Sequence, residues 1–453
     1  MPELLPAMTD DDLHNVEQGN LVDSLAKELF QDESFLQSFG VAKNKIEFQK
    51  RIENDEFVCI ADIVIHQKEE NEIWLLEVKA ASRVKDELLD DIVFQKIVFE
   101  QLGYRVSKSF LVHVNKEYIL NGDLDLPQFF SVTETSDTVE AKLDLAKERI
   151  GEAIELIKSD EPAPRIPFGC RNKYDCPFFK RHFTNLPKYS VFNIIRLHRS
   201  KLQQLVDMKI FDLREIPEHF EVSKNQQLQI QVTKNNEALI DEDKIRDIIQ
   251  GLEYPIYFFD YESFSYAVPV QNGVIPYQQM VFQYSLHVLE EPNSELQHFE
   301  YLLKSKDESV ERLVESLASN IDTSKGTAIV WHASFEKARN REMARMFPKY
   351  QVFFEELNDM VYDLEDIFMD KLYVHPDFMG RSSIKKILPV LAPEYNYNEL
   401  EISNGKIATV KWHHMTDGRF DKATTEQVYN DLLEYCKLDT LAMVSIFDVL
   451  RKI

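Results

Sequence analysis

Short apolar runs that alternate with helical patterns constrain what this chain can fold into. Residues 255–262 begin with a proline and are rich in aromatic and β-branched side chains, which predicts a buried strand. Residues 57–65 and 72–79 predict the two strands of a hairpin, and residues 425–450 have the apolar spacing of a long helix. The pattern predicts an α/β chain, and 453 residues suffice for two or three domains that each bury a core.

The strand predicted at residues 255–262 ends in two acidic residues. Asp260 and Glu262 are two positions apart, so they share one face of the strand. Neighbouring carboxylates repel each other unless a cation lies between them, and Mg²⁺ or Mn²⁺ prefers carboxylate oxygen. The pair therefore indicates a divalent-metal site. The alternative, which is the more common one for a single D-x-E in an acidic chain, is two solvated side chains at a strand edge.

Two further motifs follow in the sequence. Glu336 comes near the start of a predicted helix, after the apolar run 326–331, and there the helix dipole alone would favour a carboxylate. Tyr435 and Asp439 are four residues apart on the helix predicted at 425–450, so they lie on one face of it. An exposed Tyr and Asp one turn apart are common, so only the three motifs together indicate a catalytic site.

In combination, these motifs resemble those of the DEDD exonucleases of the ribonuclease H-like fold, in the subgroup whose last motif is Y-x-x-x-D. The resemblance covers residues 253–453. It implies that two divalent ions, Mg²⁺ or Mn²⁺, clamp the attacking and leaving oxygens of a phosphodiester. The metal ligands would be Asp260, Glu262, Glu336 and Asp439. Tyr435 would orient the attacking water.

The chain departs from the DEDD pattern in its second motif. That motif usually reads N-x-x-F-D, whereas this chain has His332 and Glu336, and glutamate carries its charge one methylene further from the backbone. Asp363 is another acid at a position that these enzymes often fill, and we expect it to cap a helix or to support the metal ligands. The segment 382–388, which contains Lys385, resembles the S-x-K-x-L helix start that precedes the third motif.

A second constellation lies in the hairpin predicted near the N-terminus. Asp62 comes late in its first strand, and Glu77 and Lys79 share a face late in the second. With Gln95 on the helix that follows, the layout resembles the RecB-like branch of the PD-(D/E)XK nucleases. The resemblance implies Asp62 and Glu77 as Mg²⁺ or Mn²⁺ ligands, Lys79 as a catalytic residue and Gln95 as its support. By itself, E-x-K is more often an ordinary pair on one strand face.

Proteins of the RecB-like branch often carry two further features. One is G-x-x-x-H on an upstream helix, where this chain has Gly19 and, in place of the histidine, Asp23. The other is an iron–sulfur cluster held by four cysteines. This chain has Cys170 and Cys176 in the corresponding segment but no cysteine in residues 1–30, and two cysteines cannot supply four ligands. We therefore expect no iron–sulfur cluster.

The charge of the chain is acidic overall, with a basic segment in the middle. The formal net charge is −26, which is unusual for a protein that binds nucleic acid through its phosphates. Residues 165–201, however, contain nine Lys or Arg against one Asp, with aromatic residues between them that could stack on bases. The expected nucleic-acid contacts are Arg171, Lys173, Lys180, Arg181 and Lys385. The alternative for this segment is a solvated connector.

The expected organisation is similar to that of bacterial proteins that fuse a RecB-like half to a DEDD-type half. We expect a RecB-like nuclease domain at residues 1–160, a basic segment and helical connector at 161–250, and a ribonuclease H-like domain with a mixed sheet at 251–453. No apolar run is long enough to span a bilayer, so no membrane partner is expected. The few cysteines indicate a reducing, cytoplasmic location.

These features together predict a metal-dependent nuclease that binds nucleic acid, with DNA favoured over RNA. The C-terminal half would be a 3′–5′ exonuclease, and the N-terminal half would cleave DNA. Two alternatives stay open. One is a catalytically reduced nucleic-acid-binding or assembly factor, and the other is a scaffold whose acidic surface binds basic proteins.

Overall fold

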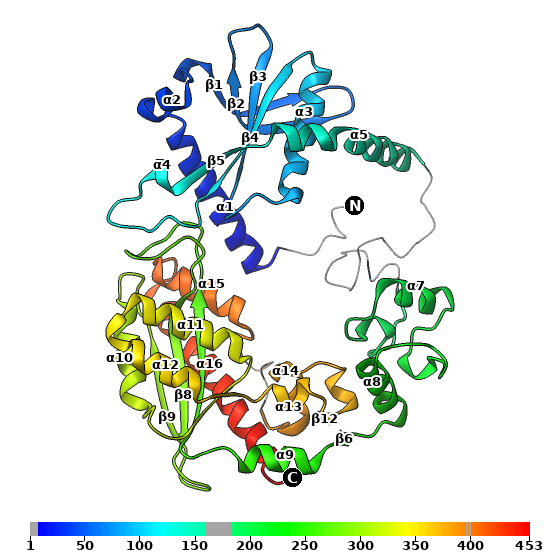
Figure 1. Cartoon of the computed structure of the whole chain (residues 1–453), viewed down its shortest axis with the longest axis vertical. Coiled ribbons are helices and arrows are strands. Elements are labelled where there is room, and N and C mark those ends of the chain that lie inside the picture. The colour runs from blue at the N-terminus through cyan, green and yellow to red at the C-terminus, as the bar shows by residue number, and fades with distance from the viewer. Residues whose placement is uncertain (1–7, 160–178, 180–182, 396, 398–399) are drawn as a thin grey trace. The chain divides into compact units, whose positions relative to one another are not determined.

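The computed structural model describes residues 8–159, 179, 183–395, 397 and 400–453, and it is a mixed α/β structure (Figure 1). Its residues form two compact units. The N-terminal unit comprises Thr9–Ala163 and Ser265–Gln278, and the C-terminal unit contains Pro164–Phe264 and Gln279–Ile453. Most of the connector expected at 161–250 therefore belongs to the same unit as the segment expected at 251–453. Residues 265–278 of that segment belong instead to the N-terminal unit.

The N-terminal unit is built on a five-stranded mixed sheet in the order β1-β2-β3-β4-β5. Its strands are β1 (Ile46–Glu53), β2 (Val58–His66), β3 (Glu72–Lys79), β4 (Arg105–Val114) and β5 (Phe130–Glu134). All neighbours are antiparallel except β3 and β4, which are parallel and joined through α3 (Asp90–Gln101). A parallel pair needs such a crossover, because a tight turn can join only antiparallel strands. The hairpin predicted from the sequence is confirmed as β2 and β3.

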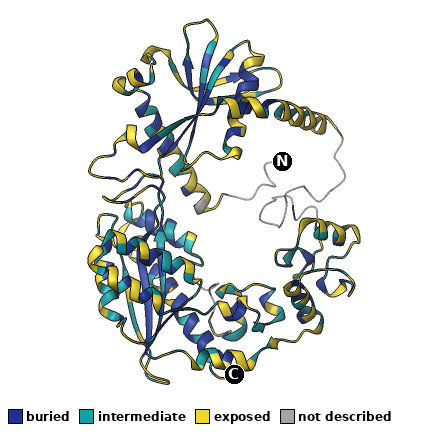
Figure 2. Ribbon diagram, in the orientation of Figure 1, coloured by how far each residue is buried: buried dark blue, intermediate teal, exposed yellow. Residues whose placement is uncertain are grey.

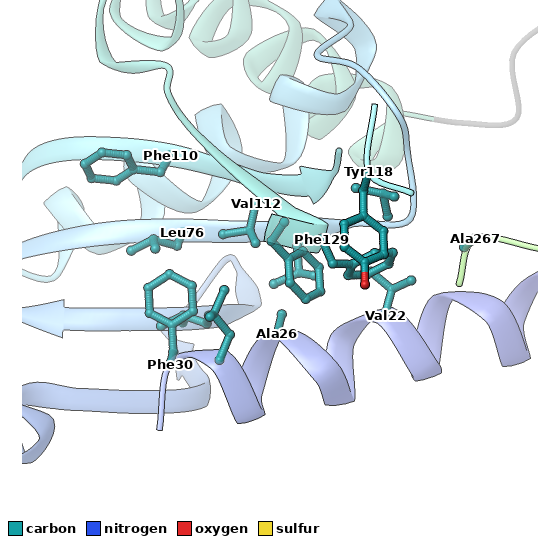
Figure 3. Close-up of a cluster of buried hydrophobic side chains, with 14 of the residues drawn as sticks. Val22, Ala26, Phe30, Leu76, Phe110, Val112, Tyr118, Phe129 and Ala267 are labelled. Carbon is teal, nitrogen blue, oxygen red and sulfur yellow. The ribbon is translucent and has the colours of Figure 1, made fainter. Parts of the chain in front are cut away.

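Helices cover both faces of this sheet. On one face, α1 (Asp10–Leu29) packs Val22 and Ala26 against a cluster that includes Leu76 and Val112 (Figure 3). On the other face lie α3 and α5 (Ser136–Lys158), whose apolar side chains contact each other and β4. Alternate residues of β3 and β4 supply the two cores, as the period of a strand requires. Glu77, one position after Leu76, therefore points toward α3.

The segment 265–278 leaves the C-terminal sheet and packs within the N-terminal unit. Its backbone pairs with the loop before α4 (Leu126–Phe129), where the Leu120 amide donates to the Val274 carbonyl at 3.1 Å and the Gly273 amide donates to the Leu120 carbonyl at 2.8 Å. Ala267 is buried in the same cluster as Val22 (Figure 3). The polypeptide therefore passes into the N-terminal unit a second time, which the sequence pattern did not predict.

The C-terminal unit is built on a second five-stranded mixed sheet, in the order β11-β10-β7-β8-β9. Its strands are β7 (Ile256–Phe264), β8 (Met280–Leu289), β9 (Gln297–Leu302), β10 (Thr327–Val330) and β11 (Val361–Asp363). β7 pairs in parallel with β10 and antiparallel with β8, so it is central. Nearly all residues of β7 and β8 are buried (Figure 2), as expected for strands covered on both faces.

Helices of the C-terminal unit pack on this sheet and extend beyond its edge. Those that contact its strands are α10 (Val310–Asn320), α11 (Ala333–Met346), α15 (Gly405–Thr416) and the long α16 (Lys422–Leu450), and α12 (Gln351–Asp359) packs on α11. Beyond them lie α13 (Asp366–Met369), α14 (Ile384–Leu391) and the connector helices α7 (Arg199–Asp207), α8 (Lys224–Asn235) and α9 (Glu242–Gln250). A two-stranded ladder of β6 (Leu239–Ile240) and β12 (Tyr373–Val374) ties the connector to this unit. Over the residues described, no helix is long and apolar enough to cross a membrane.

Candidate functional site

β7 carries Asp260 and Glu262 on the face that α16 covers. Phe258, two residues before Asp260 and thus on the same face, packs edge-to-face on Phe447 of α16, with ring centroids 5.5 Å apart. The pairing of β7 with β8 becomes irregular immediately after Glu262. Such irregularities re-aim side chains and are common next to active sites. The predicted common face of the two acids is confirmed.

The long helix α16 brings the third motif to the same place. Tyr435 and Asp439, one turn apart, are both buried. One carboxylate oxygen from each of Asp260, Glu262 and Asp439 lies within 4.8 Å of the other two. Three predicted ligands therefore converge, although the helix lies more than a hundred residues after the strand. The sequence predicted only the spacing of the residues within each motif.

Glu336 occupies the first turn of α11 and faces the same space. It is 2 % exposed, and its Oε2 atom has no hydrogen-bond partner among the described residues. A cavity of about 290 Å³, called here the acid cavity, is bounded by side chains from β7, α11, α14 and α16. The six predicted site residues that line it are Asp260, Glu262, Glu336, Lys385, Tyr435 and Asp439.

Asp363 holds the start of α11. Its carboxylate accepts hydrogen bonds from the backbone amides of His332 at 3.0 Å and Ala333 at 2.7 Å. These amides are among the helix donors that have no partner within the helix. His332 itself has φ 78°, a left-handed conformation that few residues other than glycine and asparagine adopt readily. The predicted helix-capping role of Asp363 is confirmed, and it fixes the position of Glu336.

Burial dominates the electrostatics of the acid cavity. Burial and the neighbouring carboxylates raise the pKa values of Asp260, Glu262 and Glu336 well above their ordinary range. Burial also raises the pKa of Asp439 to about 6, against a hydrogen bond from Tyr397 and the charge of Lys385, which favour its ionised form. Among the described residues that line the cavity, Lys385 is the sole Lys or Arg. Four carboxylates against one ammonium suit a divalent cation, which would offset the excess negative charge.

Lys385, at the start of α14, lies inside this arrangement. Its Nζ atom donates to the Ser403 carbonyl at 2.6 Å and to the Tyr435 hydroxyl at 3.2 Å. The same atom lies 5.1 Å from the ring centroids of both Tyr397 and Tyr435. Burial lowers its pKa, while Asp439 and the other acids raise it. The structure thus places Lys385 against the acids rather than on an open surface.

Sequence reasoning missed three residues that shape the acid cavity. Tyr397 is buried and donates to Asp439 Oδ1 at 2.6 Å. Gly405, the first residue of α15, approaches Glu262 so closely that a Cβ atom there would lie 3.1 Å from its Oε2. Cys436 Sγ lies 3.9 Å from Asp260 Oδ2. The helix start at Gly405 was detectable, because an asparagine N-cap precedes it, but nothing local indicates that it faces Glu262.

A second site lies between β2, β3 and α3 of the N-terminal unit. Asp62 Oδ2 accepts from the Val78 amide at 2.8 Å. Glu77 is buried, and its two oxygens accept from Gln95 Nε2 at 2.7 Å and from Lys79 Nζ at 2.8 Å. Lys79 Nζ also donates to Asp91. All four predicted residues of this site are therefore brought together.

Charges at this second site also repel one another. Burial, followed by the charge of Asp62, raises the pKa of Glu77 to about 7. Burial raises the pKa of Asp62 as well, and Asp23 on α1 adds to that shift. Asp23 Oδ1 is buried and has no hydrogen-bond partner in the part of the chain described, whereas Oδ2 pairs with Lys27 at 2.6 Å. An acid on α1 thus faces this site, at the position where the sequence has Asp23 instead of histidine.

Several predicted residues lie outside the described part of the chain. They are the cysteines and the basic residues of the central segment, Cys170, Arg171, Lys173, Cys176, Lys180 and Arg181. The other two cysteines, Cys59 and Cys436, are described, and both are buried and free.

Comparisons with known proteins give a partial match to one family model and to uncharacterized relatives. The model of a domain of unknown function, DUF2779, matches residues 257–383, a span that includes Asp260, Glu262 and Glu336. The chain is similar to the uncharacterized protein UU173 of Ureaplasma parvum, with 26% identity over 246 residues, 49% of this chain and 34% of the relative. It is also similar to the uncharacterized protein MG366 of Mycoplasma genitalium, with 30% identity over 212 residues, 42% of this chain and 31% of the relative. The chain thus spans about a third of the length of these relatives. No solved structure matches it.

Proposed function

We propose that this chain is a metal-dependent nuclease whose principal active site is the acid cavity of the C-terminal unit. The observation that carries the proposal is the convergence of four carboxylates from β7, α11 and α16 on one cavity, three of them buried and Asp260 half-buried, with oxygens of three of the four within 4.8 Å of each other. Such a set is costly to bury without cations. The order of these acidic residues along the chain supports a DEDD-type 3′–5′ exonuclease in a ribonuclease H-like unit.

The residues of the cavity divide into metal ligands and groups that position the reactants. Asp260, Glu262, Glu336 and Asp439 would hold two Mg²⁺ or Mn²⁺ ions, which stabilise the attacking and leaving oxygens of the scissile phosphate. Tyr397 fixes one oxygen of Asp439 by its hydrogen bond. Such supporting contacts orient metal ligands and keep them ionised.

Tyr435 is suited to orient the attacking water. Burial and the nearby Asp439 raise its pKa, so the phenol keeps its proton at neutral pH and acts as a hydrogen-bond donor rather than as a base. Lys385 donates to the phenol oxygen at 3.2 Å. That bond occupies an acceptor position of the hydroxyl, whose own proton interacts with Asp439 and favours the ionised form of that carboxylate.

The site in the N-terminal unit supports a second, RecB-like nuclease centre that acts on DNA. Asp62 and Glu77 would hold one or two metal ions, with Asp23 as a further acid in place of the usual histidine. Lys79 would position or polarise the attacking water, and Gln95 holds Glu77 by the hydrogen bond at 2.7 Å. DNA is the favoured substrate class for both centres, and a cytoplasmic location accords with this proposal.

One observation favours a catalytically reduced binding factor as the second candidate. The oxygens of Glu336 are not part of the close group formed by Asp260, Glu262 and Asp439. If the longer side chain cannot reach a second metal ion, the C-terminal unit would bind nucleic acid without cleaving it.

The test is cleavage of 5′-labelled single-stranded DNA and RNA with Mn²⁺. Wild type is compared with Asp260→Asn, with Glu77→Gln, and with Glu434→Gln as a control, because Glu434 is an exposed acid next to Tyr435. The proposal predicts a ladder shortened from the 3′ end that is lost in Asp260→Asn and kept in the other two. Absence of cleavage of every substrate by the wild type, with binding retained, would support the binding factor instead.

A further inference from the structure

A second and larger cavity of about 1190 Å³ opens next to the acid cavity within the C-terminal unit. One wall is formed by residues 191–199 and the first turn of α8, and the other by residues 365–383. Ser383 lines this larger cavity, while the two residues that follow it, Ile384 and Lys385, line the acid cavity. Glu365 of the larger cavity also contacts His332 of the acid cavity at 3.3 Å. The two cavities therefore share a rim.

The charge of this larger cavity is opposite to that of the chain. Arg196, Arg199, Lys371 and Arg381 line it, against the single carboxylate of Glu365, in a protein of formal net charge −26. Arg196 and Arg381 are exposed, and neither forms an ion pair with a carboxylate of the described residues. In a chain with excess acid, two arginines without a carboxylate partner point to an anionic ligand.

The two walls are held together by close packing. Gly380 has φ +74°, and a Cβ atom there would lie 2.3 Å from Nε2 of Gln229 on α8. Gln229 Nε2 donates to the Tyr189 hydroxyl at 2.5 Å, and its Oε1 accepts from the Ile195 amide at 3.1 Å. The loop that carries Arg196 is therefore fixed to α8, and α8 is fixed to the wall that carries Arg381. The cavity is pre-formed, so a ligand need not order it.

Aromatic side chains form part of one wall. The rings of Phe368, Tyr373 and Phe378 pack on one another, with centroids 5.6 to 6.0 Å apart, and all three line the cavity. Phe368 and Phe378 are buried, so they form the floor of the cavity, and the half-buried Tyr373 is the ring of this group that a base could contact. Arginines beside an accessible aromatic ring are the combination that holds single-stranded nucleic acid, where phosphates contact the cations and bases stack on rings.

We infer that this larger cavity, the basic groove, binds the single strand whose 3′ end enters the acid cavity, with backbone phosphates on Arg196 and Arg381. The direction of the strand rests on the proposed function, whereas the binding of single-stranded nucleic acid does not. The shared rim at Ser383–Lys385 gives the strand a continuous path from the groove to the four carboxylates.

The test separates binding from chemistry by using two probes. Binding of a fluorescent oligothymidylate of about 15 nucleotides is measured by anisotropy in EDTA over a series of salt concentrations, because such a strand is long enough to fill a groove of this kind. Hydrolysis of the p-nitrophenyl ester of thymidine 5′-phosphate with Mn²⁺ is measured in parallel, because this small ester needs only the acid cavity. The variant is Arg196→Gln/Arg381→Gln, and the matched control is Arg341→Gln/Arg345→Gln on α11, two exposed arginines that line neither cavity.

The double variant in the groove should bind the oligonucleotide about tenfold more weakly and lose about 1.4 from the slope of log K against log salt, roughly 0.7 for each phosphate contact. Its ester hydrolysis and thermal midpoint should match the wild type, as should every property of the control. Equal affinity and equal slope in the groove variant and the wild type would overturn the inference, as would no oligonucleotide binding by the wild type at low salt. A third outcome is that the wild type binds the oligonucleotide but cleaves neither probe, and that the groove variant loses this binding. That outcome would support the groove and refute the proposed nuclease.

Discussion

The hydrogen bond from Tyr397 to Asp439 offers a sharp test of how the acid cavity works. Tyr397→Phe removes one hydroxyl and leaves the ring in place, so the change is confined to the bond that Asp439 Oδ1 accepts at 2.6 Å. This bond is the largest of the contributions that favour the ionised form of Asp439 against burial. Without it, the carboxylate should hold a proton more tightly.

The size of the effect follows from the energy of the bond. A hydrogen bond to a charged group is worth about 1.5–3 kcal/mol, and one pKa unit corresponds to about 1.4 kcal/mol, so the pKa of Asp439 should rise by about one to two units. From its present value of about 6 it would move to neutral pH or above. There a proton competes with a metal ion for the same oxygens, so the apparent Mn²⁺ affinity at neutral pH should fall about tenfold.

The assay is titration of Mn²⁺ into metal-free protein by calorimetry at a series of pH values. The affinity of Tyr397→Phe should approach that of the wild type as the pH rises, because the competing proton is then lost. Tyr301→Phe is the matched control, since Tyr301 donates to Glu308 at 2.7 Å away from the acid cavity. A Tyr397→Phe protein whose Mn²⁺ affinity equals the wild type at every pH would refute this reasoning.

Three further predictions follow from the same contacts. Gly405→Ala should lower kcat on the order of tenfold to a hundredfold with little change in Tm, because the added Cβ, 3.1 Å from Glu262 Oε2, displaces this proposed metal ligand. Asp363→Ala should lower the free energy of unfolding by about 1–2 kcal/mol, measured by denaturation, because two amides at the start of α11 lose their acceptor. In EDTA, the local stability of β3, measured by hydrogen exchange, should fall as the pH is raised from 4.5 to about 7. The reason is that the pKa of Glu77 is raised from 4.5 to about 7, so the folded state binds more protons than the unfolded chain in that range.

Each of these predictions has a result that contradicts it. For Gly405→Ala it is wild-type kcat in a protein that binds Mn²⁺ normally. For Asp363→Ala it is a stability equal to that of Asp359→Ala, an exposed acid at the end of α12. For the pH dependence it is a β3 stability that is constant or rises over the stated range, or one that changes equally in Glu77→Gln.

Local patterns were sufficient to predict the strands β2, β3 and β7, which carry predicted site residues, and the geometry within each motif. The apolar run before Asp260 is β7, and the acids two apart share its face because a strand repeats every two residues. Tyr435 and Asp439 lie one turn apart on α16 for the corresponding reason in a helix. These relations depend on a few neighbouring residues, and the sequence contains them fully.

The contacts that the sequence did not predict join residues far apart in the chain. Tyr397 reaches Asp439 from 42 residues away, and Gly405 meets Glu262 across more than a hundred. The insertion of residues 265–278 into the N-terminal unit has no local signal either, because its ends are ordinary strand ends of β7 and β8. Such contacts arise from how helices and strands pack, and a single sequence does not encode that packing in any short pattern.

The most direct test of the central claim is the location of Mn²⁺ in crystals of the protein grown with this ion, by anomalous diffraction. The proposal predicts two peaks about 3.5–4 Å apart in the acid cavity, in contact with Asp260, Glu262 and Asp439, and none there in Asp260→Asn. Crystals with saturating Mn²⁺ that show no peak among these carboxylates would contradict the account of the C-terminal unit as a two-metal nuclease.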